Sequence, residues 1–308
     1  MSRARTVFLG SGPFGVAALR RLSEHARIEL VGVVTAPARP TGRHKVETPT
    51  PVEIAARDLG APLVTPPRLR TADAVASVLA LDPALIVLAD YGQIVPAAIL
   101  DVPNGALNLH PSLLPRYRGA SPVPAAILAG DTETGVTLMR MDEGLDTGPI
   151  VAAERVSLAG TETAPDLESR LAGVAAELLA RSVGPWLDGQ LAPVPQPAEG
   201  ATLTRPLRRE DGRLNPSSPA VELERRIRAY TPWPGTFLET RIGRLIVHAA
   251  HVESAEPVDA AGTIVANGDG IAVATADGRL VLDEVQPAGG NRMSGAALRR
   301  GRPGVVDR

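Results

Sequence analysis

The chain has 308 residues, a formal net charge of −2 at pH 7, no cysteine and five histidines. Nearly balanced charge excludes a global basic surface, so any nucleic-acid contact must depend on local patches. The absence of cysteine excludes disulfides and thiolate metal sites, and five scattered histidines lead us to expect no metal centre. The length favours two domains.

We expect a cytoplasmic protein with no membrane segment. The first residues lack the apolar core of a signal peptide, and no apolar run approaches the length needed to span a bilayer. A chain without cysteine also suits a reducing compartment.

The first elements predict a parallel α/β sheet. Residues 6–9 and 28–35 form two apolar runs separated by a helical pattern, which implies a right-handed crossover. The turn at 10–15 matches G-x-G-x-x-G, a pattern typical of dinucleotide sites. We interpret it otherwise, because Pro13 stands inside the pattern and the second run ends at Thr35 without the acid that binds a ribose.

Residues 36–49 are polar and bracketed by prolines, so we expect a long loop without helix or strand. The loop contains Arg39, Arg43 and Lys45, which suit phosphate contacts. A merely solvated loop is the other interpretation, and charge alone does not separate the two.

The next elements continue the alternation and end in an apolar strand over 84–89. This strand runs into Asp90 and then into Tyr91, Gly92, Gln93 and Ile94. Ligands bind beyond the carboxyl ends of strands in open parallel sheets, so we expect residues 91–94 to line a pocket. The elements on either side are a helix from 51, a strand over 62–64, a helix over 72–79, a helix over 122–129, strands over 135–140 and 150–156, and a long helix over 166–187.

The strand that ends at His110 is the predicted centre of the chemistry. Asn108 and His110 are two positions apart and therefore share one face. Asp146 lies in a glycine-punctuated loop where a carboxylate can face the histidine. Acyl transfer needs an oxyanion donor, a proton carrier and an anion that orients the carrier, and these three residues provide them. We expect the carboxylate to raise the histidine pKa and keep the ring charged.

The remaining third predicts a second, β-rich domain. Residues 190–206 are proline-rich and without periodicity, which is typical of a semi-extended linker. A helix over 220–230 and five short strands follow, as in a small barrel. We therefore divide the chain into 1–188, a linker at 189–206, and 207–308. Basic residues near the junction suit either phosphate contacts or a solvated surface: Arg205, Arg208 and Arg209.

Several motifs together resemble the folate-dependent formyltransferases, over nearly the whole chain. They are P-A-R-P-T-G-R at 37–43, N-L-H-P-S-L-L-P at 108–115, R-G-A-S-P at 118–122, E-T-G-V-T at 133–137, G-L-D-T-G at 144–148 and I-R-A-Y-T-P-W-P-G at 227–235. The resemblance implies a Rossmann-like catalytic domain followed by an OB-like barrel. It also implies that the chain is one of the family members that act on charged tRNA.

The resemblance carries roles to individual positions. It implies transfer of the formyl group of 10-formyltetrahydrofolate to the amino group of methionine on initiator tRNA, with catalytic Asn108, His110 and Asp146. The 36–49 loop, with Arg43 on the matching arginine, and the second domain would hold tRNA, and Asp90 departs from the family's usual small residue. The folate pocket would be formed by Tyr91, Gly92, Gln93 and Ile94 on one side and by Ser112, Leu113, Leu114 and Pro115 on the other.

Two other functions stay open at the level of sequence. A relative on the same scaffold formylates an amino sugar or small amine, or hydrolyses formyl-folate, and only the 36–49 loop and the second domain argue against it. A binding module for nucleotides or RNA is the second alternative, disfavoured by the set of Asn108, His110 and Asp146. We expect a monomer.

Overall fold

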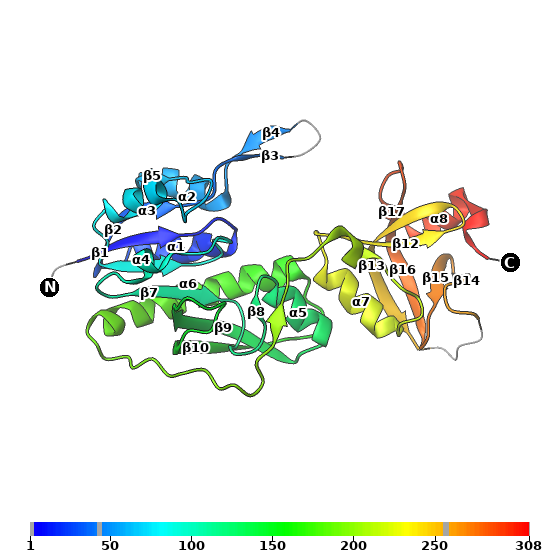
Figure 1. Cartoon of the computed structure of the whole chain (residues 1–308). Coiled ribbons are helices and arrows are strands. Elements are labelled where there is room, and N and C mark those ends of the chain that lie inside the picture. Colours follow the sequence, from blue (N-terminus) through cyan, green and yellow to red (C-terminus); the bar gives the residue numbers. More distant parts are fainter. Residues whose placement is uncertain (1–2, 42–44, 255–258, 308) are drawn as a thin grey trace. The chain divides into compact units, whose positions relative to one another are not determined.

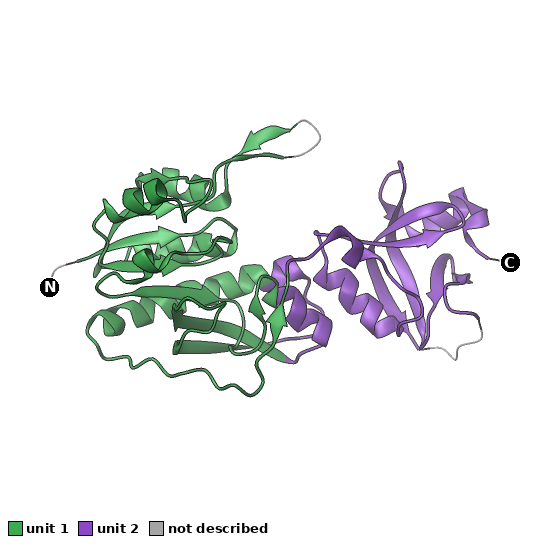
Figure 2. Cartoon of the chain, in the orientation of Figure 1, with its two compact units in different colours: residues 1–122, 133–157, 168–205 green, residues 123–132, 158–167, 206–308 purple. Residues whose placement is uncertain are grey.

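The computed structural model describes residues 3–41, 45–254 and 259–307 (Figure 1). The chain divides into two compact units, shown in Figure 2. Unit 1 contains residues 1–122, 133–157 and 168–205, and unit 2 contains residues 123–132, 158–167 and 206–308. Two short pieces that precede residue 168 therefore group with the carboxy-terminal part of the chain.

Unit 1 is built on a seven-stranded sheet with the order β10-β9-β7-β6-β1-β2-β5. The pairs from β7 to β5 are parallel, as predicted, whereas β9 is antiparallel to both β7 and β10. The strand order reverses between β1 and β6, so the loops after β1, β6 and β7 share one edge. The strands are β1 (Ala4–Leu9), β2 (Ile28–Val34), β5 (Leu63–Val64), β6 (Leu85–Leu88), β7 (Ala106–His110), β9 (Glu133–Arg140) and β10 (Ile150–Ser157).

The helices connect these strands and begin where the sequence provides a start signal. Helix α2 has Pro51 at its first position, and Thr50 Oγ1 accepts a hydrogen bond from Glu53 N at 3.0 Å. One core cluster joins the sheet to its helices through fully buried Val7, Val78 and Ile86. The helices are α1 (Phe14–Ser23), α2 (Pro51–Asp58), α3 (Ala72–Leu79), α4 (Ala97–Leu100), α5 (Pro122–Ala129) and α6 (Ala164–Leu187).

The expectation of a loop without strands at 36–49 is wrong. Strands β3 (Arg39–Thr41) and β4 (Val46–Thr48) pair antiparallel, with Pro40 opposite Glu47. All six residues of these strands are exposed. Proline is tolerated here because a two-stranded ribbon leaves its outer N–H positions unpaired.

The proline-rich stretch near residue 200 also contains a strand. Strand β11 (Leu203–Thr204) pairs parallel with β8 (Arg118–Gly119), and Val194 forms an isolated bridge with Ile150. This stretch therefore hydrogen-bonds to earlier parts of unit 1 at two separate places, residues 118–119 and residue 150.

Unit 2 contains an antiparallel sheet with the order β12-β13-β16-β15-β14, and β17 pairs with β16. Its five main strands are those that the sequence predicts, and α7 supplies buried Leu223 and Ile227 to their core. From residue 206 on, the elements of this unit are α7 (Ala220–Ala229), β12 (Thr236–Thr240), β13 (Gly243–Glu253), β14 (Ile264–Asn267), β15 (Gly270–Ala274), β16 (Arg279–Pro287), β17 (Met293–Ser294), α8 (Gly295–Gly301) and two short 3-10 helices (Arg209–Gly212 and Pro303–Val305). In the part of the chain described, no helix is long and apolar enough to cross a membrane.

Candidate active site

Strand β7 delivers two polar side chains to the edge of the sheet. Asn108 pairs with Leu88 of β6 and Met139 of β9, and His110 pairs with Thr137. Asn108 and His110 are each only 5% exposed, and their spacing places them on one face of the strand. A buried amide and imidazole at a strand end require polar partners, which defines this edge as the candidate site.

Asp146 faces the histidine ring, as the sequence predicts. Its Oδ2 lies 3.6 Å from His110 Nδ1, and the two side chains are 14% and 6% exposed. The same oxygen accepts a hydrogen bond of 2.7 Å from Gly119 N. The β9–β10 connection that carries Asp146 is closed by Asp142, whose Oδ1 accepts from Gly144 N and Thr147 Oγ1.

The second ring nitrogen has a partner that sequence reasoning missed. His110 Nε2 lies 2.9 Å from the main-chain carbonyl of Tyr117. A carbonyl can only accept, so we infer that Nε2 carries the proton and that Nδ1 is the nitrogen free to exchange one. The sequence does not show which main-chain carbonyl faces the ring, so Tyr117 could not be predicted as the partner of His110 Nε2.

The expectation that the nearby carboxylate keeps His110 charged needs correction. Burial lowers the pKa of His110 below its ordinary value, while Asp146 and the Tyr117 carbonyl act in the opposite direction. Burial is the largest of these influences because the ring is almost completely removed from water. The direction of this shift favours the neutral ring, and Asp146 is placed to stabilise its charged form.

The loop after β6 runs beside this edge. Burial raises the pKa of Tyr91 to about 12, and its side chain packs in the core. Gln93 Oε1 accepts from Leu69 N at 2.8 Å, whereas Ile94 is 77% exposed. Among the described residues, none forms a hydrogen bond with the main chain of residues 91–94. This loop thus offers main-chain donors and acceptors to a ligand.

The loop after β7 is held more tightly. Ser112 is fully buried, and its Oγ donates to Arg116 O at 2.6 Å. Leu114 N donates to Thr137 Oγ1 at 3.0 Å, and the Leu114–Pro115 peptide bond is cis. Residues 112–115 and 91–94 follow neighbouring strands, as predicted for the two walls of one pocket.

The glycine turn after β1 is not arranged to hold a pyrophosphate. The main-chain amides of Ser11 and Gly12 both donate to the carbonyl of Asp90, at 2.8 and 3.1 Å. A Cβ on Gly12 would overlap the Asp90 carboxylate, so the turn packs on the loop after β6.

The basic residues predicted to contact tRNA lie at several exposed places. Arg39 and Lys45 belong to the β3–β4 hairpin, Arg43 lies outside the described residues, and Arg205 follows β11. In unit 2, Arg208 N donates to Asp211 Oδ2, and the Arg209 guanidinium lies 5.7 Å from the centre of the Trp233 ring.

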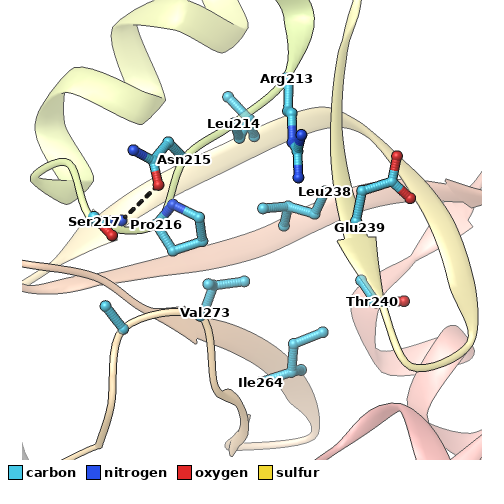
Figure 3. A pocket seen from close by; sticks show the side chains of 12 residues that line it. Arg213, Leu214, Asn215, Pro216, Ser217, Leu238, Glu239, Thr240, Ile264 and Val273 are labelled. Carbon is cyan, nitrogen blue, oxygen red and sulfur yellow. Dashed lines mark hydrogen bonds between the residues drawn. The ribbon is translucent and has the colours of Figure 1, made fainter.

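A separate cavity of about 560 Å³ lies in unit 2 (Figure 3). None of its twelve lining residues is a predicted catalytic, folate or tRNA residue. Leu238, Ile264 and Val273 supply apolar surface, and Arg213 and Glu239 are also part of its lining. Among residues 3–41, 45–254 and 259–307, no group of three or more His, Asp or Glu side chains is placed to hold a metal ion.

Comparison with known proteins agrees with this fold. A formyl transferase family model matches residues 4–183, and a model of the formyl transferase C-terminal domain matches residues 206–303. The crystal structure of HypX from Aquifex aeolicus with tetrahydrofolic acid has a TM-score of 0.65 at 18% identity, covering all of this chain and 49% of that one. The fold and the two matching family models thus define a formyl transferase.

Full-length relatives narrow the class further. The chain is 43% identical over 303 residues to methionyl-tRNA formyltransferase of Myxococcus xanthus, covering 98% of this chain and 96% of that protein. It is 46% identical over 299 residues to methionyl-tRNA formyltransferase of Roseiflexus castenholzii, covering 96% of each. The chain belongs to the methionyl-tRNA formyltransferase family and is a formyl-group transferase.

Proposed function

We propose that this protein transfers the formyl group of 10-formyltetrahydrofolate to the α-amino group of methionine on initiator tRNA, for translation initiation in the cytoplasm, and acts as a monomer. The observation that carries the proposal is the end of β7, where a buried histidine has both ring nitrogens directed at acceptors and shares its strand face with Asn108. Because the chain belongs to the methionyl-tRNA formyltransferase family, we take methionyl-tRNA as the acceptor of the formyl group.

In the proposed reaction the unprotonated amine attacks the formyl carbon and forms a tetrahedral intermediate. The Asn108 amide donates a hydrogen bond to the oxyanion, a contribution of about 2.7–4 kcal/mol for one such donor. His110 Nδ1 accepts the proton that the amine loses, and Asp146 stabilises the resulting imidazolium. While the ring is protonated, its Nδ1–H also donates to the oxyanion. Collapse then breaks the carbon–nitrogen bond to the folate, and Nδ1 returns its proton to the leaving nitrogen.

We assign the folate to the pocket between residues 91–94 and 112–115. A pterin needs donors and acceptors along one edge, and the main chain of 91–94, which forms no hydrogen bond with another described residue, offers both. Ser112, Leu113, Leu114 and Pro115 form the opposite wall, fixed through Thr137. The chemistry of these residues fits a reduced folate and requires no metal.

We assign tRNA contacts to the hairpin and to the basic residues around residue 205. Arg39 and Lys45 are exposed on the hairpin, and Arg43 completes the matched motif. Arg205, Arg208 and Arg209 are the other candidates, and the 189–206 stretch would separate the catalytic domain (1–188) from a tRNA-binding domain (207–308). Glu210 Oε1 lies 3.9 Å from Arg208 Nη1, and its negative charge reduces the positive potential around Arg208.

An acceptor competition tests the proposal. The full chain is given 10-formyltetrahydrofolate, charged initiator tRNA and an excess of a free amino sugar, and products are resolved on acid gels and by mass spectrometry. We expect formylmethionyl-tRNA as the main product. Formylation of the sugar with no formylated tRNA would overturn the tRNA assignment while leaving formyl transfer intact.

A further inference from the structure

One extended segment, residues 194–204, contacts both partners of the His110 ring. It lies in the stretch that the sequence predicted as a linker and belongs to unit 1. Its hydrogen bonds reach the loop that contains Asp146 and the loop that contains Tyr117. These are the residues that face His110 Nδ1 and Nε2.

Gln196 holds the Asp146 side. Its Nε2 donates to Asp146 O at 2.9 Å and to Gly148 O at 2.7 Å. Its Oε1 accepts from Arg118 Nε at 3.1 Å and from Arg118 Nη2 at 2.7 Å. Carbonyls only accept and a guanidinium only donates, so the orientation of the amide is unambiguous and all of its hydrogen-bonding capacity is used.

Thr202 holds the Tyr117 side. Its Oγ1 accepts from Tyr117 N at 2.7 Å, and its main chain donates to Pro115 O and accepts from Arg118 N. The parallel pairing of β11 with β8 continues these contacts. The Tyr117 carbonyl, which accepts from His110 Nε2, is thus attached to a peptide fixed from the 194–204 segment.

Both contacted residues have a backbone conformation that needs outside support. Tyr117 has a φ of 58° and Asp146 a φ of 53°, in the left-handed region that non-glycine residues rarely adopt. Such conformations persist where surrounding contacts determine them. Gln196 bonds to the carbonyl of Asp146 itself, so it bears directly on the direction of the carboxylate.

We propose that Gln196 is a positioning residue for formyl transfer, which acts through Asp146 on the proton exchange at His110. The inference rests on the proposed function, since it assigns Gln196 a part in that reaction. Asp146 is the charged side chain within ion-pair distance of the ring among the described residues, and it raises the His110 pKa against the effect of burial. If Asp146 turns away, that support is lost and the ring becomes a weaker base.

The test compares full-length wild type with Gln196→Met and Gln196→Glu. Methionine keeps the length of the side chain without its hydrogen bonds, and glutamate keeps the acceptor for Arg118 but cannot donate to the two carbonyls. Gln190→Glu is the matched control, because it adds the same charge at an exposed position nearby. Single-turnover rates on charged initiator tRNA are measured from pH 5 to 9, with dissociation constants for tRNA and reduced folate.

We expect both Gln196 variants to lower the single-turnover rate by about 10–100-fold, as for supporting residues that orient a catalytic group. Both dissociation constants should stay within about threefold of wild type, a range far below the rate effect. In Gln196→Met, the acid limb of the rate profile should move to lower pH because Asp146 no longer raises the pKa of His110. Gln190→Glu should match wild type in every measurement.

Two results would overturn the inference. An unchanged rate in Gln196→Met would remove the positioning role, and a slower rate with an unmoved acid limb and a lower melting temperature would make Gln196 merely structural. Wild type that transfers no formyl group to tRNA would instead overturn the proposed function, and this inference with it.

Discussion

Two proline-containing stretches of unit 1, the β3–β4 hairpin and the 194–204 segment, differ in the way they are held. The hairpin is exposed along both strands, and the side-chain hydrogen bonds of its described residues, between Thr41 and Thr48 and from Thr48 to Val46 O, lie within it. The 194–204 segment has little charge but hydrogen-bonds to the loops on both sides of His110. Under the proposed function, charge marks the stretch that would contact tRNA, whereas hydrogen-bond partners mark the stretch that would support the chemistry.

The largest effect should come from the group that the 194–204 segment supports. We expect Asp146→Asn to lower the single-turnover rate by about 10²–10⁴-fold, the usual contribution of general acid–base catalysis, because an amide cannot stabilise an imidazolium. Folate and tRNA affinities should be retained. Glu143→Gln, an exposed acid of the same loop, is the control and should remain active. An Asp146→Asn rate within a few-fold of wild type would remove Asp146 from the catalytic set.

The second prediction concerns stability against pH. The folded-state pKa of His110 is lowered by burial. Below about pH 6.5 the unfolded chain therefore binds a proton at this histidine that the folded chain does not yet bind. The free energy of unfolding should therefore fall as the pH decreases from 7 to 5, by at most about 1.4 kcal/mol per pH unit from this one group.

His110→Gln isolates that contribution from the other titrating groups. Denaturant melts of both proteins at pH 5, 6 and 7 should show a steeper acid loss in wild type. Equal slopes in the two proteins would mean that His110 is not held neutral by its surroundings.

These contrasts also show what the sequence could predict. The alternation along β7 and the glycine-punctuated loop were enough to predict that Asn108, His110 and Asp146 lie close together. Thr50 followed by Pro51 marked the start of α2. Strands and helices with a clear period were found almost to the residue, as in α3 (Ala72–Leu79).

The missed features depend on partners distant in sequence. Nothing local in residues 194–204 reveals that Gln196 meets Asp146, 50 positions away, or that Thr202 meets Tyr117. The hairpin was missed because prolines argue against regular sheet, although a short exposed ribbon tolerates them. The charge state of His110 was misjudged because burial depends on the whole fold.

The smallest effect is expected in the hairpin. Arg39→Ala removes one exposed positive charge, so it should weaken tRNA binding by less than about tenfold and reduce the salt slope of binding by about one or less. Arg39→Lys keeps the charge and should therefore retain most of the tRNA affinity and of the salt slope. The single-turnover rate at saturating tRNA should not change in either variant. The same holds for Arg43→Ala in the matched motif. A changed rate with unchanged affinity would place the hairpin in the chemistry and break the contrast.

Truncation is a poorer test of this contrast than point variants. A cut at residue 188 would remove the 194–204 segment with its bonds to the Asp146 loop. Cuts after residue 206 would separate residues 123–132 and 158–167 from the rest of unit 2. Loss of activity in either product would not distinguish tRNA binding from support of the active site.

The most direct test of the central claim is the protonation state of His110 in the full chain, measured by ¹⁵N NMR of the imidazole nitrogens. The chain has only five histidines, and the signal is assigned by comparison with His110→Gln. We predict a neutral ring at pH 7 with its proton on Nε2, facing the Tyr117 carbonyl, and a pKa below the ordinary value. A ring that is doubly protonated at pH 7, or protonated on Nδ1 alone, would contradict the account of His110 as the group that accepts the proton of the amine.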